Sequence, residues 1–167
     1  MMKTLILIPS RMAATRLPGK PLLKINNLSI ISHVFKRAEE ANIGEVAVAT
    51  DNQEIFEDVL KNGGRAILTN IHHRTGTDRI YEAYKKLNIK NIDYILNLQG
   101  DEPDIDKDDS INLNNLMINQ SADLGTLAAK IKNNEMLNNR NVVKVITEEK
   151  LEKNNFPKAL NFTRDNL

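Results

Sequence analysis

The chemistry that this sequence could support begins with three basic side chains, Arg11, Arg16 and Lys20, which lie within ten residues of a nearly neutral chain. Arginine presents a planar fork that matches phosphate oxygens, and lysine presents a compact point charge. Gly19 and two nearby alanines let backbone N–H groups approach an anion. Composition alone favours a solvated basic loop, since surface lysine and arginine are common. Because the segment 9–21 directly follows an apolar run, we favour a phosphate-binding loop, although it contains neither a Walker A nor a G-x-G-x-x-G pattern.

A second candidate group is the carboxylate of Asp101, in the segment 98–103 (Leu-Gln-Gly-Asp-Glu-Pro), which follows another apolar run. Mg²⁺ in nucleotide-using proteins is typically held by one or two carboxylates together with substrate phosphates. A Gly-Asp turn is also a common way to leave a strand, and for this segment alone the two interpretations are about even. Both this segment and the basic loop follow apolar runs that we expect to be strands of one sheet. Because the two segments are then expected at the same edge of that sheet, we favour Asp101 as a ligand of Mg²⁺.

A third candidate segment is 74–79 (Arg-Thr-Gly-Thr-Asp-Arg), which leads from a loop into a predicted helix. The hydroxyl and backbone groups of Thr75, Gly76 and Thr77 could form hydrogen bonds with the edge of a base. The alternative is a capping box at the start of the helix, followed by a surface arginine at Arg79, and the spacing alone favours this alternative.

The elements that must position these residues alternate between apolar strands and amphipathic helices. This order predicts right-handed crossovers and an α/β fold with a mostly parallel sheet and helices on both faces. Ligands bind such sheets beyond the carboxyl ends of the strands, where the basic loop and Asp101 are expected. We expect Asp51 and Thr77 to cap two of the helices. The predicted strands are 5–8, 45–50, 65–69, 94–98, 124–131, 142–146 and 159–163, and the predicted helices are 29–42, those carrying residues 55–60 and 80–87, and 108–120.

Composition limits the class of protein. A length of 167 residues predicts one domain, and a content of 41% hydrophobic and 27% charged residues excludes a disordered chain. A net charge of +1 gives no bulk attraction to nucleic acid or to anionic membranes, so we expect neither as a partner. The lack of cysteine excludes disulfides, thiolate catalysis and cysteine-ligated metals. No apolar run approaches the ~20 residues of a membrane span, and we expect a cytoplasmic protein.

The candidate segments described above, together with other parts of the chain, resemble the CMP-Kdo synthetases, the cytidylyltransferases that activate 3-deoxy-D-manno-octulosonate (Kdo). The match extends over the whole chain in the right order. The resemblance is carried by residues 8–11, 15–21, 49–51, 75–79, 97–103, 141–145 and 162–164.

The resemblance implies a Rossmann-like nucleotidyltransferase fold, here as one domain over residues 1–167. It implies an enzyme of lipopolysaccharide biosynthesis that uses CTP and Kdo as substrates and Mg²⁺ as cofactor, releases pyrophosphate and forms a homodimer. The chain ends before the usual C-terminal portion of the family, so the resemblance implies a truncated member. A non-catalytic nucleotide-binding remnant and a CMP-sialate-type synthetase are the alternatives.

The resemblance also implies roles for individual residues. Arg11, Arg16 and Lys20 would hold the triphosphate of CTP. Asp101 would bind Mg²⁺ and, with Arg11 and Lys20, would form the catalytic set that stabilises charge during phosphoryl transfer. Arg164 would lie near the sugar-acid pocket. The residues implied to recognise cytosine are Thr75, Gly76, Thr77, Arg79 and Gln99.

Overall fold

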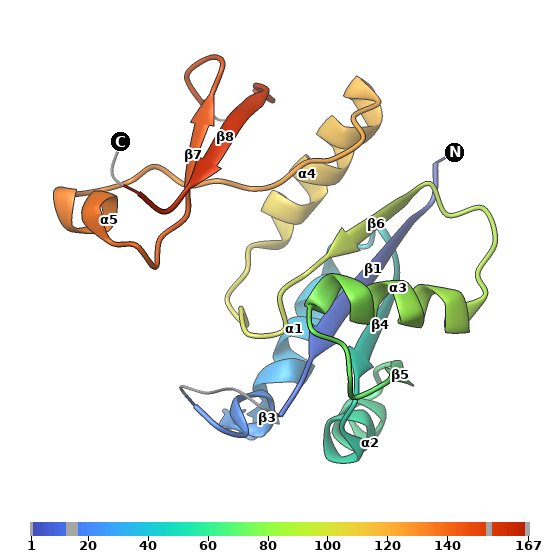
Figure 1. Ribbon diagram of the computed structural model, residues 1–167. Helices are drawn as coiled ribbons and strands as arrows, with labels where there is room; N and C mark the ends of the chain where they lie inside the picture. Colours follow the sequence, from blue (N-terminus) through green and yellow to red (C-terminus); the bar gives the residue numbers. More distant parts are fainter. Residues whose placement is uncertain (1, 13–16, 153–154, 166–167) are drawn as a thin grey trace. The chain divides into compact units, whose positions relative to one another are not determined.

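Strand β1 (Thr4–Ser10) lies in the interior of a four-stranded parallel sheet with the order β5-β4-β1-β6 (Figure 1). β4 (Gly44–Thr50) and β6 (Tyr94–Asn97) pair with β1, and β5 (Ala66–Leu68) pairs with the outer side of β4. Strands buried on both faces are apolar throughout, which is why β1 lacks the usual alternation of polar and apolar residues. The predicted mostly parallel sheet is confirmed.

The computed structural model describes residues 2–12, 17–152 and 155–165, and the chain divides into two compact units, residues 1–114 and 115–167. The sheet and the helices that cover it belong to the first unit. The single domain expected from chain length stays a prediction.

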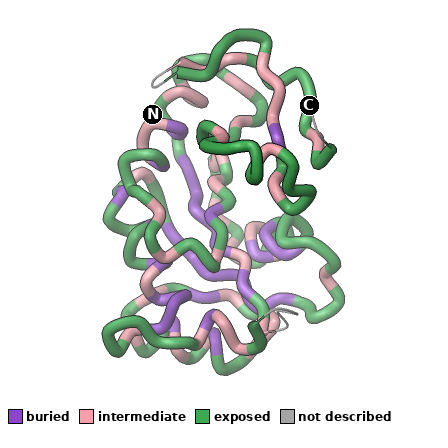
Figure 2. The backbone as a smooth tube through the Cα atoms, turned by 90° about the vertical axis from the view of Figure 1, so that its left-hand side faces the viewer, coloured by how far each residue is buried: buried purple, intermediate pink, exposed green. Residues whose placement is uncertain are grey.

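Helices cover both faces of the sheet (Figure 1). α1 (Ile30–Glu40) and α2 (Gln53–Lys61) pack on one face, and α3 (Gly76–Leu87) packs on the other. Successive strand side chains point to opposite faces, so each strand supplies both layers of the core, and buried backbone runs through the interior of this unit (Figure 2). Strand residues facing α1 and α2 are Ile6, Ile8, Val46 and Val48, and those facing α3 are Leu5, Leu7, Ala47 and Ala49.

A short 3₁₀ helix and a small hairpin lie between β1 and α1. The helix η1 spans Lys20–Leu22, and the hairpin pairs β2 (Lys24–Ile25) with β3 (Leu28–Ser29). The connecting residues Asn26 and Asn27 have φ angles of 48° and 66°. Two-residue hairpin turns of type I′ need positive φ at both positions, and asparagine tolerates this conformation better than most residues do. This hairpin was not among the predicted elements.

Two predicted helix caps are wrong, each by a small shift along the chain. Asn52, and not Asp51, caps α2, because its side-chain oxygen accepts the backbone N–H of Ile55 at 3.0 Å. Thr75, and not Thr77, caps α3. Both kinds of side chain can cap a helix, and the tertiary contacts of Asp51 decide the first case.

The helix predicted over residues 108–120 is confirmed as α4 (Lys107–Gln120). This helix runs across the boundary between the two units, and the second unit contains the short helix α5 (Asn134–Asn138) and an antiparallel pair, β7 (Lys144–Thr147) with β8 (Ala159–Thr163). The strand predicted over 124–131 is wrong, since this stretch has no regular secondary structure and is mostly exposed. An apolar run forms a strand only where a neighbouring strand accepts its hydrogen bonds.

Replacement of Gly44 by alanine should destabilise the sheet. A Cβ atom at Gly44 would lie 1.9 Å from the backbone oxygen of Thr4, its partner in β1, so the strands would have to separate. Overpacking of this kind costs about 1–3 kcal/mol of the free energy of unfolding, which urea denaturation measures. Glu45→Ala, which removes an exposed ion pair with Arg65, is the control and should cost at most about 1 kcal/mol. Equal losses in the two variants would contradict this prediction.

Candidate nucleotide-binding site

Three segments meet at the carboxyl end of β1, where Pro9 lies. A Cβ atom at Gly100 would lie 2.7 Å from the backbone oxygen of Pro9, and one at Gly76 would lie 3.3 Å from the Pro9 ring. The loop after β6 therefore approaches β1 so closely that only glycine fits at position 100, and the first turn of α3 lies in tight contact with Pro9. The prediction placed the basic loop and Asp101 at one edge of the sheet, and the ion pair between Lys20 and Asp101 agrees with it. The approach of α3 to the same point was not predicted.

Lys20 and Asp101 form an ion pair at this edge. Lys20 Nζ lies 2.9 Å from Asp101 Oδ2 and 3.4 Å from the backbone oxygen of Asp101. Gly19, with a φ of 71°, is the N-cap residue directly before η1, and the ring of Pro21 within η1 is buried, so Lys20 projects from a fixed turn. The two side chains are 31% and 60% exposed, so both can reach a ligand from solvent.

Of the two other basic residues predicted to bind phosphate, the structure describes Arg11 and does not describe Arg16. Arg11 directly follows β1 and is exposed. Arg16 lies outside the described residues.

Ser10, the last residue of β1, has a hydroxyl that is buried without a hydrogen-bond partner in the described part of the chain. Buried hydroxyls are usually bonded, so this atom is a candidate ligand contact that sequence reasoning missed. Its position immediately before Arg11 was the available signal.

The first turn of α3 contains the capping box that the spacing favoured. The Thr75 hydroxyl accepts the backbone N–H of Asp78 at 3.1 Å and donates to Asp78 Oδ2 at 2.7 Å. The Thr75 hydroxyl lowers the pKa of Asp78, because its hydrogen bond stabilises the ionised carboxylate. Gly76 and Thr77 are exposed and begin the helix, where backbone N–H groups have no partner within the helix.

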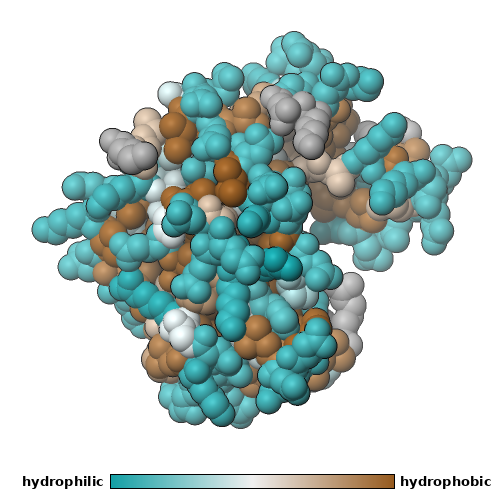
Figure 3. All heavy atoms as spheres, turned by 180° about the vertical axis from the view of Figure 1, so that it is seen from behind, coloured by the Kyte–Doolittle hydropathy of each residue, from teal (hydrophilic) through white to brown (hydrophobic). Residues whose placement is uncertain are grey.

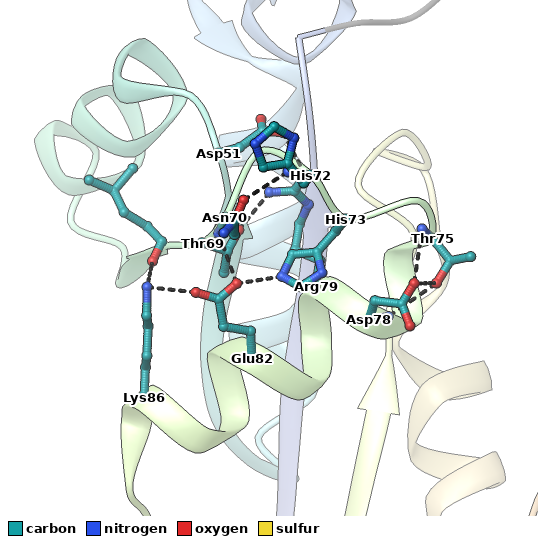
Figure 4. A network of polar contacts seen from close by, with 11 residues as sticks. Asp51, Thr69, Asn70, His72, His73, Thr75, Asp78, Arg79, Glu82 and Lys86 are labelled. Carbon is teal, nitrogen blue, oxygen red and sulfur yellow. Dashed lines mark hydrogen bonds and ion pairs between the residues drawn. The ribbon is translucent and has the colours of Figure 1, made fainter.

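Arg79 is buried, with only 3% of its side chain exposed, so the expected surface arginine is wrong. Its guanidinium group donates to Asp51 Oδ2 and to Thr69 Oγ1, each at 2.5 Å (Figure 4). These contacts join α3 to the carboxyl ends of β4 and β5. They also explain why Asp51 does not cap α2. Direct recognition of cytosine by Arg79 stays a prediction.

The remaining predicted residues lie in different units. Gln99 is exposed in the loop after β6, next to Asp101. Arg164 belongs to the second unit, where its Nη1 donates to the backbone oxygens of Arg140 and Asn141, each at 3.1 Å. Buried Lys144 completes this local arrangement by donating to the backbone oxygen of Arg164 at 3.0 Å.

The acidic residue Glu82 lies one turn after Arg79 on α3 (Figure 4). Its carboxylate accepts Lys86 Nζ at 2.7 Å and the backbone N–H of Asn70 at 2.8 Å, and it also contacts His73 Nε2. These contacts lower the pKa of Glu82 from 4.5 to about 2, with the Lys86 hydrogen bond as the largest cause and the Asn70 amide next. Sequence reasoning did not single out Glu82.

Within the described residues, no group of three or more histidine, aspartate or glutamate side chains could hold a metal ion. Asp101 stays a predicted ligand of Mg²⁺, which proteins commonly hold with one or two carboxylates together with phosphate oxygens. No helix among the described residues is long and apolar enough to cross a membrane. Hydrophilic side chains cover much of the first unit in the view of Figure 3.

The parallel sheet of the first unit, with Lys20 and Asp101 at one edge, has the fold of the nucleotidyltransferases. A solved structure of CMP:2-keto-3-deoxy-manno-octonic acid synthetase complexed with CTP is 38% identical, with a TM-score of 0.84 over 98% of this chain and 64% of that chain. A structure of 4-diphosphocytidyl-2C-methyl-D-erythritol synthase shares the fold, with a TM-score of 0.62 at 15% identity.

The chain belongs to the cytidylyltransferase family, whose model matches residues 5–166. It is 50% identical over 145 residues to the 3-deoxy-manno-octulosonate cytidylyltransferase of Rhodopseudomonas palustris strain BisB18, covering 86% of this chain and 59% of that protein. The protein of the same name from strain BisB5 is 46% identical over 162 residues, covering 96% of this chain and 65% of that protein. The predicted resemblance is confirmed, and the chain spans about three fifths of the length of these relatives.

Replacement of Glu82 by glutamine should lower stability in a pH-dependent way. A carboxyl whose pKa falls from 4.5 to about 2 on folding stabilises the folded state above pH 4.5, and this stability is lost as the pH falls through 2. The variant should therefore be less stable than wild type at pH 7, with a smaller difference at pH 3, as measured by urea unfolding. Glu40→Gln, which removes an exposed ion pair with Arg37, gives the size of a surface effect. A difference that is the same at both pH values would contradict this prediction.

Proposed function

We propose that this chain provides the nucleotide-binding part of a 3-deoxy-manno-octulosonate cytidylyltransferase, which transfers CMP from CTP to Kdo. The contact of 2.9 Å between Lys20 Nζ and Asp101 Oδ2 carries this proposal, because it brings a phosphate-binding cation and a metal-binding carboxylate to one point beside β1. The names of the similar relatives support the choice of CTP and Kdo as substrates.

In the proposed reaction, the anomeric hydroxyl of Kdo attacks the α-phosphorus of CTP. A bond forms between the sugar oxygen and phosphorus, the bond to the β-phosphate oxygen breaks, pyrophosphate leaves and the hydroxyl proton passes to solvent. Negative charge grows on the phosphoryl oxygens and the leaving group, and cations fixed beforehand stabilise it without further reorganisation. Lys20 and Arg11 provide this charge, with Arg16 as a third triphosphate ligand. No side chain acts as a nucleophile.

Asp101 suits Mg²⁺, which proteins commonly hold with one or two carboxylates together with nucleotide phosphates. When bound, the metal would neutralise charge on the triphosphate. Lys20 holds the Asp101 side chain at the sheet edge, so the carboxylate is already positioned before a nucleotide arrives. Gly100 allows this position, since its contact with Pro9 leaves no room for a side chain.

Several parts of this proposal rest on the resemblance and the names of relatives. Base recognition is assigned to the first turn of α3 and to Gln99, and sugar-acid binding is assigned to Arg164. A homodimer and a cytoplasmic location stay predictions. A sialate-type substrate and a non-catalytic remnant are the alternatives that a panel of sugar acids with constant CTP, scored by pyrophosphate release, would distinguish.

CTP with Mg²⁺ should raise the melting temperature of the wild-type chain, because a ligand that binds only the folded state stabilises it, by about 2.7 kcal/mol at one hundred times Kd. Lys20→Met and Asp101→Asn should each weaken this binding about tenfold or more. Their ion pair is partly exposed, so its loss should cost at most about 1 kcal/mol of stability and should leave the chain folded.

Lys24→Met is the matched control, because Lys24 is an exposed lysine in β2, four residues from Lys20. It should leave the CTP-induced shift unchanged. A wild-type chain whose melting temperature does not respond to millimolar CTP would contradict the proposed function. Equal losses in Lys24→Met and Lys20→Met would contradict the assignment of Lys20.

A further inference from the structure

Helix α3 carries a row of charged side chains next to its buried apolar face. Arg79, Glu82 and Lys86 are spaced by three and four residues, which places them on one side of the helix. We call these three residues the polar stripe. Ile80 and Ala83 alternate with them in sequence and pack against the sheet. The polar stripe is therefore held in place by the core beneath it.

Each residue of the polar stripe bonds the chain that leads from β5 into α3 (Figure 4). Lys86 Nζ donates to the backbone oxygen of Leu68 at 2.8 Å, at the end of β5. Arg79 donates to the side chain of Thr69 at 2.5 Å. Glu82 accepts the backbone N–H of Asn70 at 2.8 Å. The helix thus binds consecutive residues of the segment that precedes it.

The 69–75 loop, which connects β5 to α3, has little apolar packing of its own. Its apolar residue, Ile71, is 70% exposed. Asn70 and His72 bond each other, with the His72 N–H donating to Asn70 Oδ1 at 2.9 Å, so Asn70 organises the turn. The conformation of a loop without buried apolar contacts depends on its polar contacts.

Glu82 makes the central contacts of this arrangement. It bonds the Asn70 amide and contacts the His73 ring, so it contacts the loop at two positions. Bonds to a charged acceptor are stronger than neutral ones. The ion pair between Glu82 and Lys86 lies within the helix, whereas the contacts of Glu82 with Asn70 and His73 fix the loop.

The other end of the 69–75 loop is Thr75, which caps α3 next to Gly76. Gly76 lies against Pro9, beside the position proposed for the nucleotide. A shift of the loop would therefore move the backbone groups assigned to base recognition, while Lys20 and Asp101 on other segments would stay in place.

We propose that Glu82 is a positioning residue for cytosine recognition: it fixes the 69–75 loop so that the first turn of α3 presents its polar groups to the base of CTP. This inference rests on the proposed function. Glu82 itself touches no substrate, and it acts through Asn70, His73 and Thr75. Its loss should impair discrimination between bases more than binding of the triphosphate.

The test measures dissociation constants of the full chain for CTP, UTP and inorganic tripolyphosphate, each with Mg²⁺. Glu82→Gln should bind CTP about tenfold more weakly, with a reduced preference for CTP over UTP and unchanged affinity for tripolyphosphate. Amide hydrogen exchange at Asn70 should accelerate in the same variant without any ligand. Glu40→Gln on α1 is the control and should behave as wild type.

Lys86→Met separates positioning from stability. It removes the ion pair with Glu82 and the hydrogen bond to the backbone oxygen of Leu68 in β5, and it leaves the Glu82 contacts with Asn70 and His73 in the loop. It should lower the melting temperature and keep the preference for CTP. His73→Leu removes a loop contact without changing the helix, so it tests the same idea if Glu82→Gln fails to fold, and it should also reduce the preference.

Three results would overturn the inference. A wild-type chain with no preference for CTP over UTP would overturn the proposed function and the inference with it. A preference retained in both Glu82→Gln and His73→Leu, in a wild type that has it, would overturn the inference alone. Equal weakening of CTP and tripolyphosphate in Glu82→Gln would show general damage to the site and would also overturn it.

Discussion

The close approach of two glycines to the end of β1 is the constraint on which the candidate site depends. Gly100 and Gly76 both lie against Pro9, and at Gly100 a single added carbon would collide with backbone. Strand β1 can hold this position because its side chains are buried on both faces of the sheet. The segment with Asp101 and the first turn of α3 are thereby brought to the same point.

Two kinds of ion pair lie near the carboxyl ends of the strands, one partly exposed and one buried. Lys20 and Asp101 form a partly exposed pair. Such a pair contributes little to stability, so its two side chains can give up their mutual contact and bind a ligand. Arg79 and Asp51 are buried and form a fixed pair that joins α3 to the ends of two strands. Breaking a buried pair leaves an uncompensated charge, so this second pair belongs to the framework that holds the first.

Local patterns in the sequence were sufficient for the sheet and for part of the site. Continuous apolar runs marked β1 and β4, because these strands are buried on both faces, and helical spacing marked α1, because one face of that helix is buried. Parallel strands carry their ligands at their carboxyl ends, so Lys20 and Asp101 could be expected together. The strand expected over 124–131 failed, because an apolar run does not specify a partner strand.

The sequence by itself thus determined the layered fold, the family and the edge of the sheet at which Lys20 and Asp101 meet. Only the tertiary structure decided that Arg79 is buried, that Asp51 bonds it and leaves the helix cap to Asn52, and that the Ser10 hydroxyl has no partner among the described residues. The contacts of Glu82 belong to the same group. The physical reason is that these contacts join residues that are far apart along the chain, and no local sequence pattern predicts them. The contacts form only when the sheet and α3 have packed together.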